Sequence, residues 1–126
     1  MPAAQRTLVL LIEDDQTVQK VTTRILESFG YEVDSAEDIA GAVDLVGRRG
    51  AESACVLVDY SLKSGTGIEA IEQMHRIDAG LPMIMLSGFP QADIETNAGR
   101  TSWAGFLQKP YSAPELRSTL EMYRRA

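Results

Sequence analysis

The chain has 126 residues, 44% apolar and 24% charged, which is typical of a soluble globular protein with a real core. Twelve lysines and arginines oppose eighteen aspartates and glutamates, and this net charge of −6 disfavours nucleic acid as a partner. One cysteine excludes an internal disulfide, and no apolar run is long enough for a signal peptide or a membrane span. We therefore expect a cytoplasmic protein that does not bind membranes.

Five short apolar runs alternate with longer segments of helical periodicity, and no linker divides the chain. The predicted strands are Thr7–Ile12, Tyr31–Ser35, Ala54–Val58, Pro82–Leu86 and Ala104–Gln108. The apolar stripes of the predicted helices cover residues 18–29, 39–46, 68–74 and 116–123, and a further helix covers Gln91–Ala98. Gly30 is expected to end the first helix, and Gly47 and Gly50 the second. We expect one domain over residues 1–126, with a core of about 7–125.

Polar residues mark the ends of two of these helices. Asp15 is interpreted as the N-cap of the first helix. Ser112 and Glu115 have the spacing of a capping box at the start of the last helix. Arg124 and Arg125 suit the negative end of that helix's dipole.

Strands that alternate with helices predict a doubly wound (βα)5 fold of the flavodoxin type, with a five-stranded parallel sheet. Right-handed crossovers and the strand count favour the order 2-1-3-4-5. In such a sheet, ligands bind beyond the carboxyl ends of the strands, at the switch between the first and third strands.

Polar chemistry follows each strand near this crevice. Glu13 and Asp14 follow the first strand, Asp59 the third, Ser87 the fourth and Lys109 the fifth. Carboxylates ~4 Å apart repel by about 4 kcal/mol at an effective dielectric near 20, so converging acids need a cation. One or two carboxylates with water are the pattern of Mg²⁺, and Mn²⁺ is an acceptable substitute. Taken singly, each acid could also be a helix cap or a turn former.

A magnesium ion and a lysine around one carboxylate would form a receptor for a phosphoryl group. The carboxylate itself can act as the nucleophile and become an aspartyl phosphate. Ser87 could donate a hydrogen bond to a phosphoryl oxygen.

From about Leu8 to Arg124 the chain resembles the receiver domain of two-component response regulators, of the kind found in chemotaxis regulators. The segments that carry the resemblance are LVLLIEDDQ, VLVDYSLKSGTG, PMIMLSG and FLQKPYSAPEL, in this order and spacing. The resemblance implies that Glu13 and Asp14 hold Mg²⁺ and that a backbone carbonyl at Ser61 completes the metal site. It also implies that Asp59 accepts a phosphoryl group from a phosphohistidine on a histidine kinase or histidine phosphotransfer protein.

The resemblance further implies how the phosphoryl group is sensed. Ser87 matches the switch hydroxyl that moves toward the phosphoryl group, and Lys109 matches the lysine that pairs with it. Phe106 matches the aromatic switch position, and Pro110 the proline that follows the lysine through a cis peptide bond. Phe89 and Ser61 flank the path of an attacking water, so we expect them to set the phosphoryl lifetime.

The chain departs from the family pattern at a few positions. Lys63 replaces a common proline, Gly88 a common alanine, and Phe106 the commoner tyrosine. Ser102 and Trp103 stand where Gly-Ala is frequent. These changes bear on how tightly the switch is coupled to the face formed by the fourth strand and fifth helix, and they leave the site positions intact.

Other motifs carry less weight. The G-x-G-x-x-A spacing that begins at Gly65 follows the wrong strand for a dinucleotide site, and no acid lies about twenty residues further on. We expect Cys55 to be buried, His75 to be exposed and Trp103 to serve packing.

These residues predict a signalling switch that catalyses its own phosphorylation at Asp59, and its own dephosphorylation, to change contacts with a downstream protein target. It would be a monomer or a phosphorylation-dependent dimer, and either a stand-alone regulator or part of a larger protein. A degenerate receiver that binds partners without phosphorylation is one alternative. A small nucleotide-binding enzyme is the other, although a phosphate-cradling loop is missing after the first strand.

Overall fold

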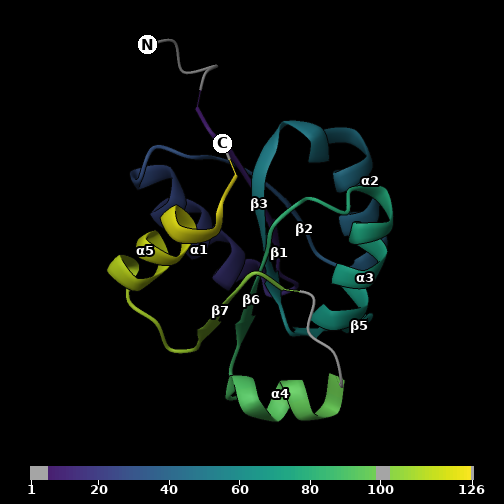
Figure 1. Cartoon of the computed structure of the whole chain (residues 1–126). Helices are drawn as coiled ribbons and strands as arrows, with labels where there is room; N and C mark the ends of the chain where they lie inside the picture. Colours follow the sequence, from purple (N-terminus) through teal and green to yellow (C-terminus); the bar gives the residue numbers. More distant parts are fainter. Residues whose placement is uncertain (1–5, 99–102, 126) are drawn as a thin grey trace.

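The computed structural model describes residues 6–98 and 103–125, so Ser102 lies outside the described residues. Strands and helices alternate along the chain (Figure 1). The strands are β1 (Leu8–Ile12), β2 (Glu32–Ala36), β3 (Ser53–Asp59), β4 (Ser61–Leu62), β5 (Gly65–Thr66), β6 (Met83–Ser87) and β7 (Gly105–Gln108). The helices are α1 (Gln16–Ser28), α2 (Ile39–Arg49), α3 (Gly67–Ile77), α4 (Gln91–Ala98) and α5 (Ala113–Tyr123), with a 3₁₀ turn η2 at Gly50–Glu52.

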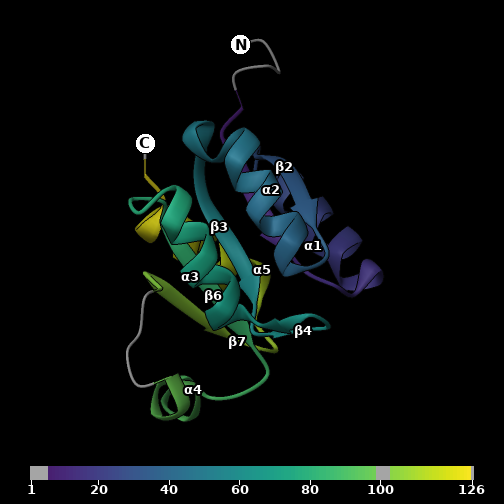
Figure 2. The same cartoon turned by 90° about the vertical axis from the view of Figure 1, so that its right-hand side faces the viewer.

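The five longer strands form one parallel sheet in the order β2-β1-β3-β6-β7. Helices α1 and α5 cover one face of this sheet, and α2 and α3 cover the other (Figures 1 and 2). Strands β4 and β5 pair only with each other and stand outside this sheet. Among the five longer strands, β6 is the fourth and β7 the fifth along the chain, so the order matches the predicted 2-1-3-4-5. The predicted doubly wound fold of the flavodoxin type is confirmed.

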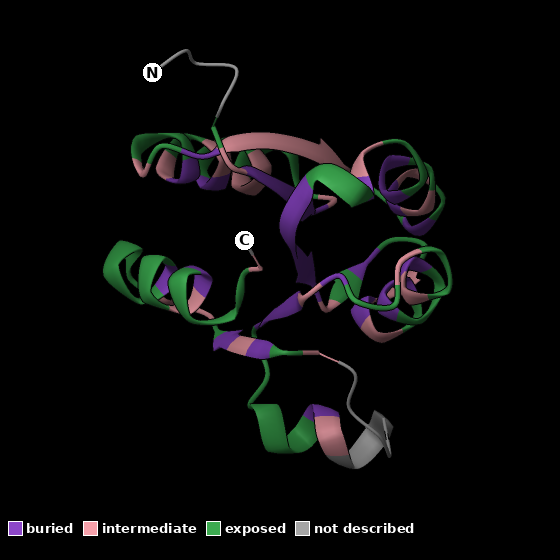
Figure 3. Ribbon diagram, turned by 45° about the horizontal axis from the view of Figure 1, so that its top comes forward, coloured by how far each residue is buried: buried purple, intermediate pink, exposed green. Residues whose placement is uncertain are grey.

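Alternate side chains of the central strands supply two cores, one on each face. Leu10 and Ile12 of β1 pack toward α2 and α3, whereas Val9 and Leu11 pack toward α1 and α5. All residues of β1, β3 and β6 are buried, while the edge strand β2 is only partly buried (Figure 3). With both faces of the central strands covered by helices, polar side chains can gather only at the ends of these strands.

The two helix caps predicted from side chains, at the starts of α1 and α5, are confirmed. The Asp15 carboxylate accepts hydrogen bonds from the amides of Thr17 and Val18. Ser112 and Glu115 form a capping box at the start of α5. The cis peptide bond before Pro110 is also confirmed.

The prediction that Arg125 interacts with the dipole of α5 is wrong. Helix α5 ends at Tyr123, and the chain then turns so that the Arg125 amide donates to the carbonyl oxygen of Ala54 at 3.0 Å. Its guanidinium donates to the carbonyl oxygens of Ser53 at 3.1 Å and Gly50 at 2.9 Å, and pairs with Asp78 at 2.9 Å. Arg125 therefore ties the end of α5 to the amino end of β3 instead of interacting with its own helix.

Of the other local predictions, some are confirmed and some are wrong. Cys55 is buried, and the partly buried Trp103 packs against the core, both as expected. His75 is half-buried instead of exposed, because its Nε2 lies 3.1 Å from the carbonyl oxygen of Leu81. Helix α2 continues through Gly47 and ends before Gly50. None of the described helices combines the length and apolar character needed to cross a membrane.

Candidate functional site

Three carboxylates meet where β1 and β3 end. Glu13, Asp14 and Asp59 each offer an oxygen, and these oxygens all lie within 4.8 Å of one another. Glu13 and Asp59 are buried and Asp14 is half-buried. The register that pairs Ile12 of β1 with Val58 of β3 brings the two strand ends side by side, so the chain segments that follow them converge.

Both oxygens of Asp59 are held by donors from different parts of the chain. The Lys109 ammonium donates to Oδ2 at 3.0 Å, and the backbone amide of Ser61 donates to Oδ1 at 3.2 Å. Lys109 also lies 3.9 Å from Glu13 Oε2. Burial by itself lowers the pKa of Lys109, but the hydrogen bond to Asp59 and the charges of both acids raise it above its ordinary value. Lys109 therefore stays protonated and fixes the orientation of Asp59.

Glu13 is the least satisfied member of this cluster. Only 2% of Glu13 is exposed, and its Oε1 accepts a hydrogen bond from the amide of Asp15 at 3.3 Å. Among the buried side-chain polar atoms of the described residues, Glu13 Oε2 alone has no hydrogen-bond partner. Burial, followed by the effect of the neighbouring Asp59 carboxylate, raises the pKa of Glu13 to about 8. A buried carboxylate oxygen without a donor, beside two other carboxylates, fits a bound cation.

Ser87 ends β6 with a fully buried side chain. Its Oγ accepts a hydrogen bond from the backbone amide of Phe89 at 2.8 Å, and its carbonyl oxygen accepts one from the amide of Lys109 at 2.6 Å. Because a hydroxyl can accept and donate at the same time, the Ser87 proton remains available to an incoming acceptor.

An aromatic pair borders the site on the side of α4. Phe89 is 53% exposed, and its ring meets the ring of Tyr60 edge to face, with centroids 6.0 Å apart. Tyr60, Phe89, Asp93 and Ile94 line a cavity of about 140 Å³. Ser61, the other residue expected near the water path, is exposed in β4.

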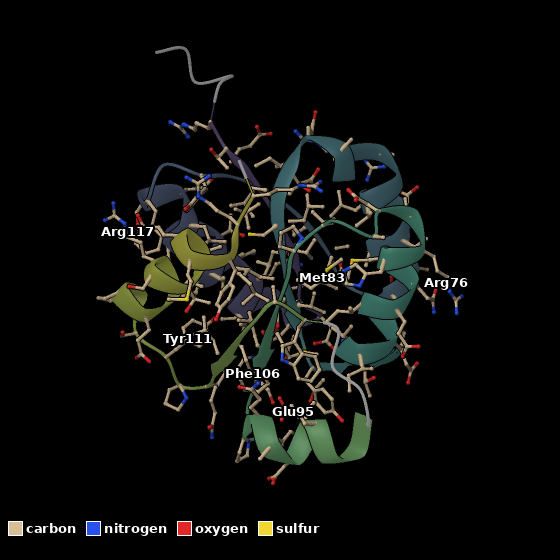
Figure 4. The ribbon with its side chains drawn as sticks, viewed as in Figure 1. Arg76, Met83, Glu95, Phe106, Tyr111 and Arg117 are labelled. Atoms are coloured by element: carbon tan, nitrogen blue, oxygen red, sulfur yellow. The ribbon has the colours of Figure 1, made fainter. Side chains whose placement is uncertain are left out.

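Phe106 and Tyr111 lie on opposite sides of the sheet (Figure 4). Phe106 is half-buried against the core under α2 and α3, and its ring centroid is 6.0 Å from that of Trp103. Tyr111 packs against the core under α1 and α5, close enough to the site that the charges of Lys109, Glu13 and Asp59 act on its pKa. Burial has the largest effect and raises that pKa.

Sequence reasoning missed two residues that lie beside this site. The side-chain amide of Gln19 in α1 donates to the carbonyl oxygen of Glu13 at 2.9 Å and so fixes the end of β1. Tyr111 was the second omission. Tyr111 could have been predicted to lie near the site, because it directly follows Lys109 and Pro110. The contact of Gln19 could not have been predicted, because it depends on the path of the loop before α1.

Comparisons with known proteins agree with this geometry. A family model described as the response regulator receiver domain matches residues 9–121. The sensor kinase CckA of Brucella abortus is 27% identical over 113 residues, which are 90% of this chain and 12% of that protein. The C4-dicarboxylate transport transcriptional regulatory protein DctD of Pseudomonas aeruginosa is 30% identical over 125 residues, 99% of this chain and 26% of that protein. The chain thus spans about a quarter or less of the length of these two relatives.

Among solved structures, one similar fold is the receiver domain of a sensor histidine kinase from Pseudomonas aeruginosa PAO1. It is 28% identical, has a TM-score of 0.82, and the match covers 94% of this chain and 97% of that one. That structure is described with a magnesium ion coordinated in its active site cleft.

Proposed function

Because the chain belongs to the response regulator receiver domain family of two-component signalling, we propose that Asp59 accepts a phosphoryl group from a phosphohistidine. The donor would be a histidine kinase or a histidine phosphotransfer protein. The observation that carries this proposal is the cluster of Glu13, Asp14 and Asp59, in which Glu13 and Asp59 lie 3.9 Å and 3.0 Å from the Lys109 ammonium group.

The net charge of the three carboxylates and Lys109 indicates which kind of ligand would neutralise the cluster. Three carboxylates and one lysine leave two negative charges uncompensated when all four groups are ionised. A divalent cation carries the opposite charge, and carboxylate oxygens are the ligands that Mg²⁺ prefers. Glu13, Asp14 and Asp59, with the carbonyl oxygen of Ser61, would hold Mg²⁺ or Mn²⁺. When bound, this ion would offset the charge of the carboxylates and of the entering phosphoryl oxygens.

In the proposed phosphoryl transfer, Asp59 supplies the nucleophile and Lys109 orients it. One carboxylate oxygen of Asp59 forms a bond to phosphorus while the phosphorus–nitrogen bond of the donor breaks. The imidazole nitrogen keeps the electron pair and takes a proton from solvent, and the product is an aspartyl phosphate. Lys109 holds Asp59 in one orientation before transfer and then offers its ammonium group to a phosphoryl oxygen.

We further propose that Ser87 and Phe106 transmit the change. The phosphoryl group adds about −1.5 to −2 charges and three acceptor oxygens next to the Ser87 hydroxyl. A rotation of the Ser87 side chain that carries its hydroxyl toward the phosphoryl group would move Oγ away from the Phe89 amide, and this would alter the loop after β6. Phe106 lies on the neighbouring strand β7, where its ring can change orientation and present a new surface to a downstream protein.

The test is the intact mass after incubation with acetyl phosphate, with and without Mg²⁺. Wild type is expected to gain one phosphoryl group only when Mg²⁺ is present, and Asp59→Asn none. Asp44→Asn removes an exposed carboxylate on α2 and serves as the matched control that keeps the adduct.

If wild type gains no adduct under conditions that label a known receiver, phosphoryl acceptance is wrong for this chain. A binding module that works without phosphorylation would then be the better description.

A further inference from the structure

The loop that follows Asp59 is a small hairpin. Ser61 pairs with Thr66 and Leu62 with Gly65, in antiparallel register. The chain then returns to the strand it left, because the Gly67 amide donates to the carbonyl oxygen of Tyr60 at 2.7 Å. A Cβ atom on Gly67 would lie 2.7 Å from the carbonyl oxygen of Asp59, so the return is too close for a side chain.

The tip of this hairpin is attached to the start of α2. The Ile39 amide donates to Ser64 Oγ at 3.1 Å, across 25 positions of sequence. Asp38, the N-cap of α2, accepts from Gly41 at 2.7 Å, so Ile39 has an amide of the first turn left to donate. Ser64 therefore caps a helix that belongs to another part of the chain.

One apolar contact accompanies this hydrogen bond. Gly65 lies so near Ile39 that a Cβ atom on the glycine would be 2.9 Å from the Ile39 Cδ1 atom. Leu62 on the other strand of the hairpin is 9% exposed and belongs to the core under α2 and α3. No proline stiffens residues 61–66, and Lys63 and Ser64 are exposed, so the tip depends on these contacts for its position.

The base of the hairpin touches the phosphoacceptor directly. The Ser61 amide donates to Asp59 Oδ1, and the carbonyl of the same residue is the proposed fourth protein ligand of the cation. A shift of the hairpin would move this amide and this carbonyl together.

We infer that Ser64 is a positioning residue for the phosphoacceptor site. Its hydrogen bond to α2 fixes the hairpin, and the hairpin fixes the Ser61 groups around Asp59. This inference rests on the proposed function, because it assigns Ser64 a part in metal binding without contact to the metal.

The experiment measures the Mg²⁺ dissociation constant by calorimetry for wild type, Ser64→Ala, Ser64→Thr and Ser118→Ala. Ser64→Ala is expected to bind Mg²⁺ about fivefold more weakly, the order of effect of losing one neutral hydrogen bond. Ser64→Thr keeps a hydroxyl and should restore most of the affinity. Ser118 is exposed on α5, so Ser118→Ala should match wild type.

Amide hydrogen exchange without metal supplies the second readout. In Ser64→Ala the amides of Ile39 and Ser61 should exchange faster, while amides of the central strands such as Leu57 should not change. A general loss of stability would instead speed exchange at all of these positions.

Two failures are distinguishable. If wild type binds Mg²⁺ and Ser64→Ala binds it equally well, the inference is wrong and the proposed function stands. If wild type binds no Mg²⁺ at all, the proposed metal site is wrong and the inference falls with it, whatever the exchange data show of the hairpin.

Discussion

Arg125 at the amino end of the central sheet and Lys109 at its carboxyl end are in opposite electrostatic conditions. At the amino end, Arg125 donates to the carbonyl oxygens of Ser53 and Gly50 and pairs with one carboxylate, that of Asp78. At the carboxyl end, Lys109 pairs with Asp59 and lies 3.9 Å from Glu13, Asp14 adds a third carboxylate to the cluster, and Glu13 Oε2 is left without a hydrogen-bond donor.

This difference separates stability from function within one fold. The Arg125 guanidinium is paired with one carboxylate and donates to two carbonyl oxygens, so its charge is compensated and these contacts stabilise the native state. Around Lys109 negative charge is in excess, which costs free energy and favours the binding of the cation proposed above. Substitutions at the two ends should therefore affect different measurements.

The largest effect is expected at the carboxyl end. Lys109→Ala removes the donor that orients Asp59 and the charge that would meet the phosphoryl group, so the rate of labelling by acetyl phosphate should fall about 100-fold. The measurement is the rate of mass increase at saturating Mg²⁺, with Lys20→Ala on the exposed side of α1 as control. A Lys109→Ala protein that labels at the wild-type rate would contradict the role assigned to Lys109.

At the amino end the effect should appear in stability alone. Arg125→Ala leaves the carbonyl oxygens of Ser53 and Gly50 without this partner and should lower the free energy of unfolding by about 2 kcal/mol. Urea unfolding measures this loss, and Arg76→Ala, an exposed arginine on α3, should change it little. The labelling rate of the folded Arg125→Ala protein should stay within about twofold of wild type, and a larger fall would show that the two ends are coupled.

The smallest expected effect is the loss, at low pH, of the stability that the Asp78–Arg125 pair contributes. The hydrogen bond from Arg125 holds the pKa of Asp78 below its ordinary value of 3.8. A carboxyl whose pKa is lowered by folding stabilises the native state above its unfolded pKa, and this contribution disappears as the pH falls through the folded pKa.

Because both side chains are partly exposed, we expect only about 0.5–1 kcal/mol from the pair. Wild type should exceed Asp78→Asn in unfolding free energy by this amount at pH 7 and match it near pH 2. An equal difference at both pH values would mean that Asp78 acts through packing and not through its charge.

The acid cluster was predictable because a simple rule of parallel sheets applies to it. Glu13, Asp14 and Asp59 directly follow strands whose apolar runs are plain in the sequence, and neighbouring parallel strands end at the same edge. Only the order of the strands had to be supplied, and right-handed crossovers limit it to few choices.

The contacts of Arg125 and Ser64 could not be predicted in this way. Arg125 meets Ser53 across 72 positions, and Ser64 meets Ile39 across 25, so each contact depends on how whole elements pack. The sequence around Arg125 favoured a local explanation, the helix dipole, which the turn after Tyr123 overrules. The β4–β5 hairpin was missed because strands of two residues carry no measurable periodicity.

The attachment of Arg125 to β3 also has a practical consequence for handling the molecule. The Arg125 amide bonds to Ala54 at the start of β3, and the Thr7 carbonyl bonds to Glu32 at the start of β2, so both residues lie at the amino end of the sheet. A fluorophore, affinity tag or sensor-chip linker joined beyond either residue would thus begin on the side opposite Asp59. The immobilised protein would present its acidic edge to the solution, where soluble partners could reach it.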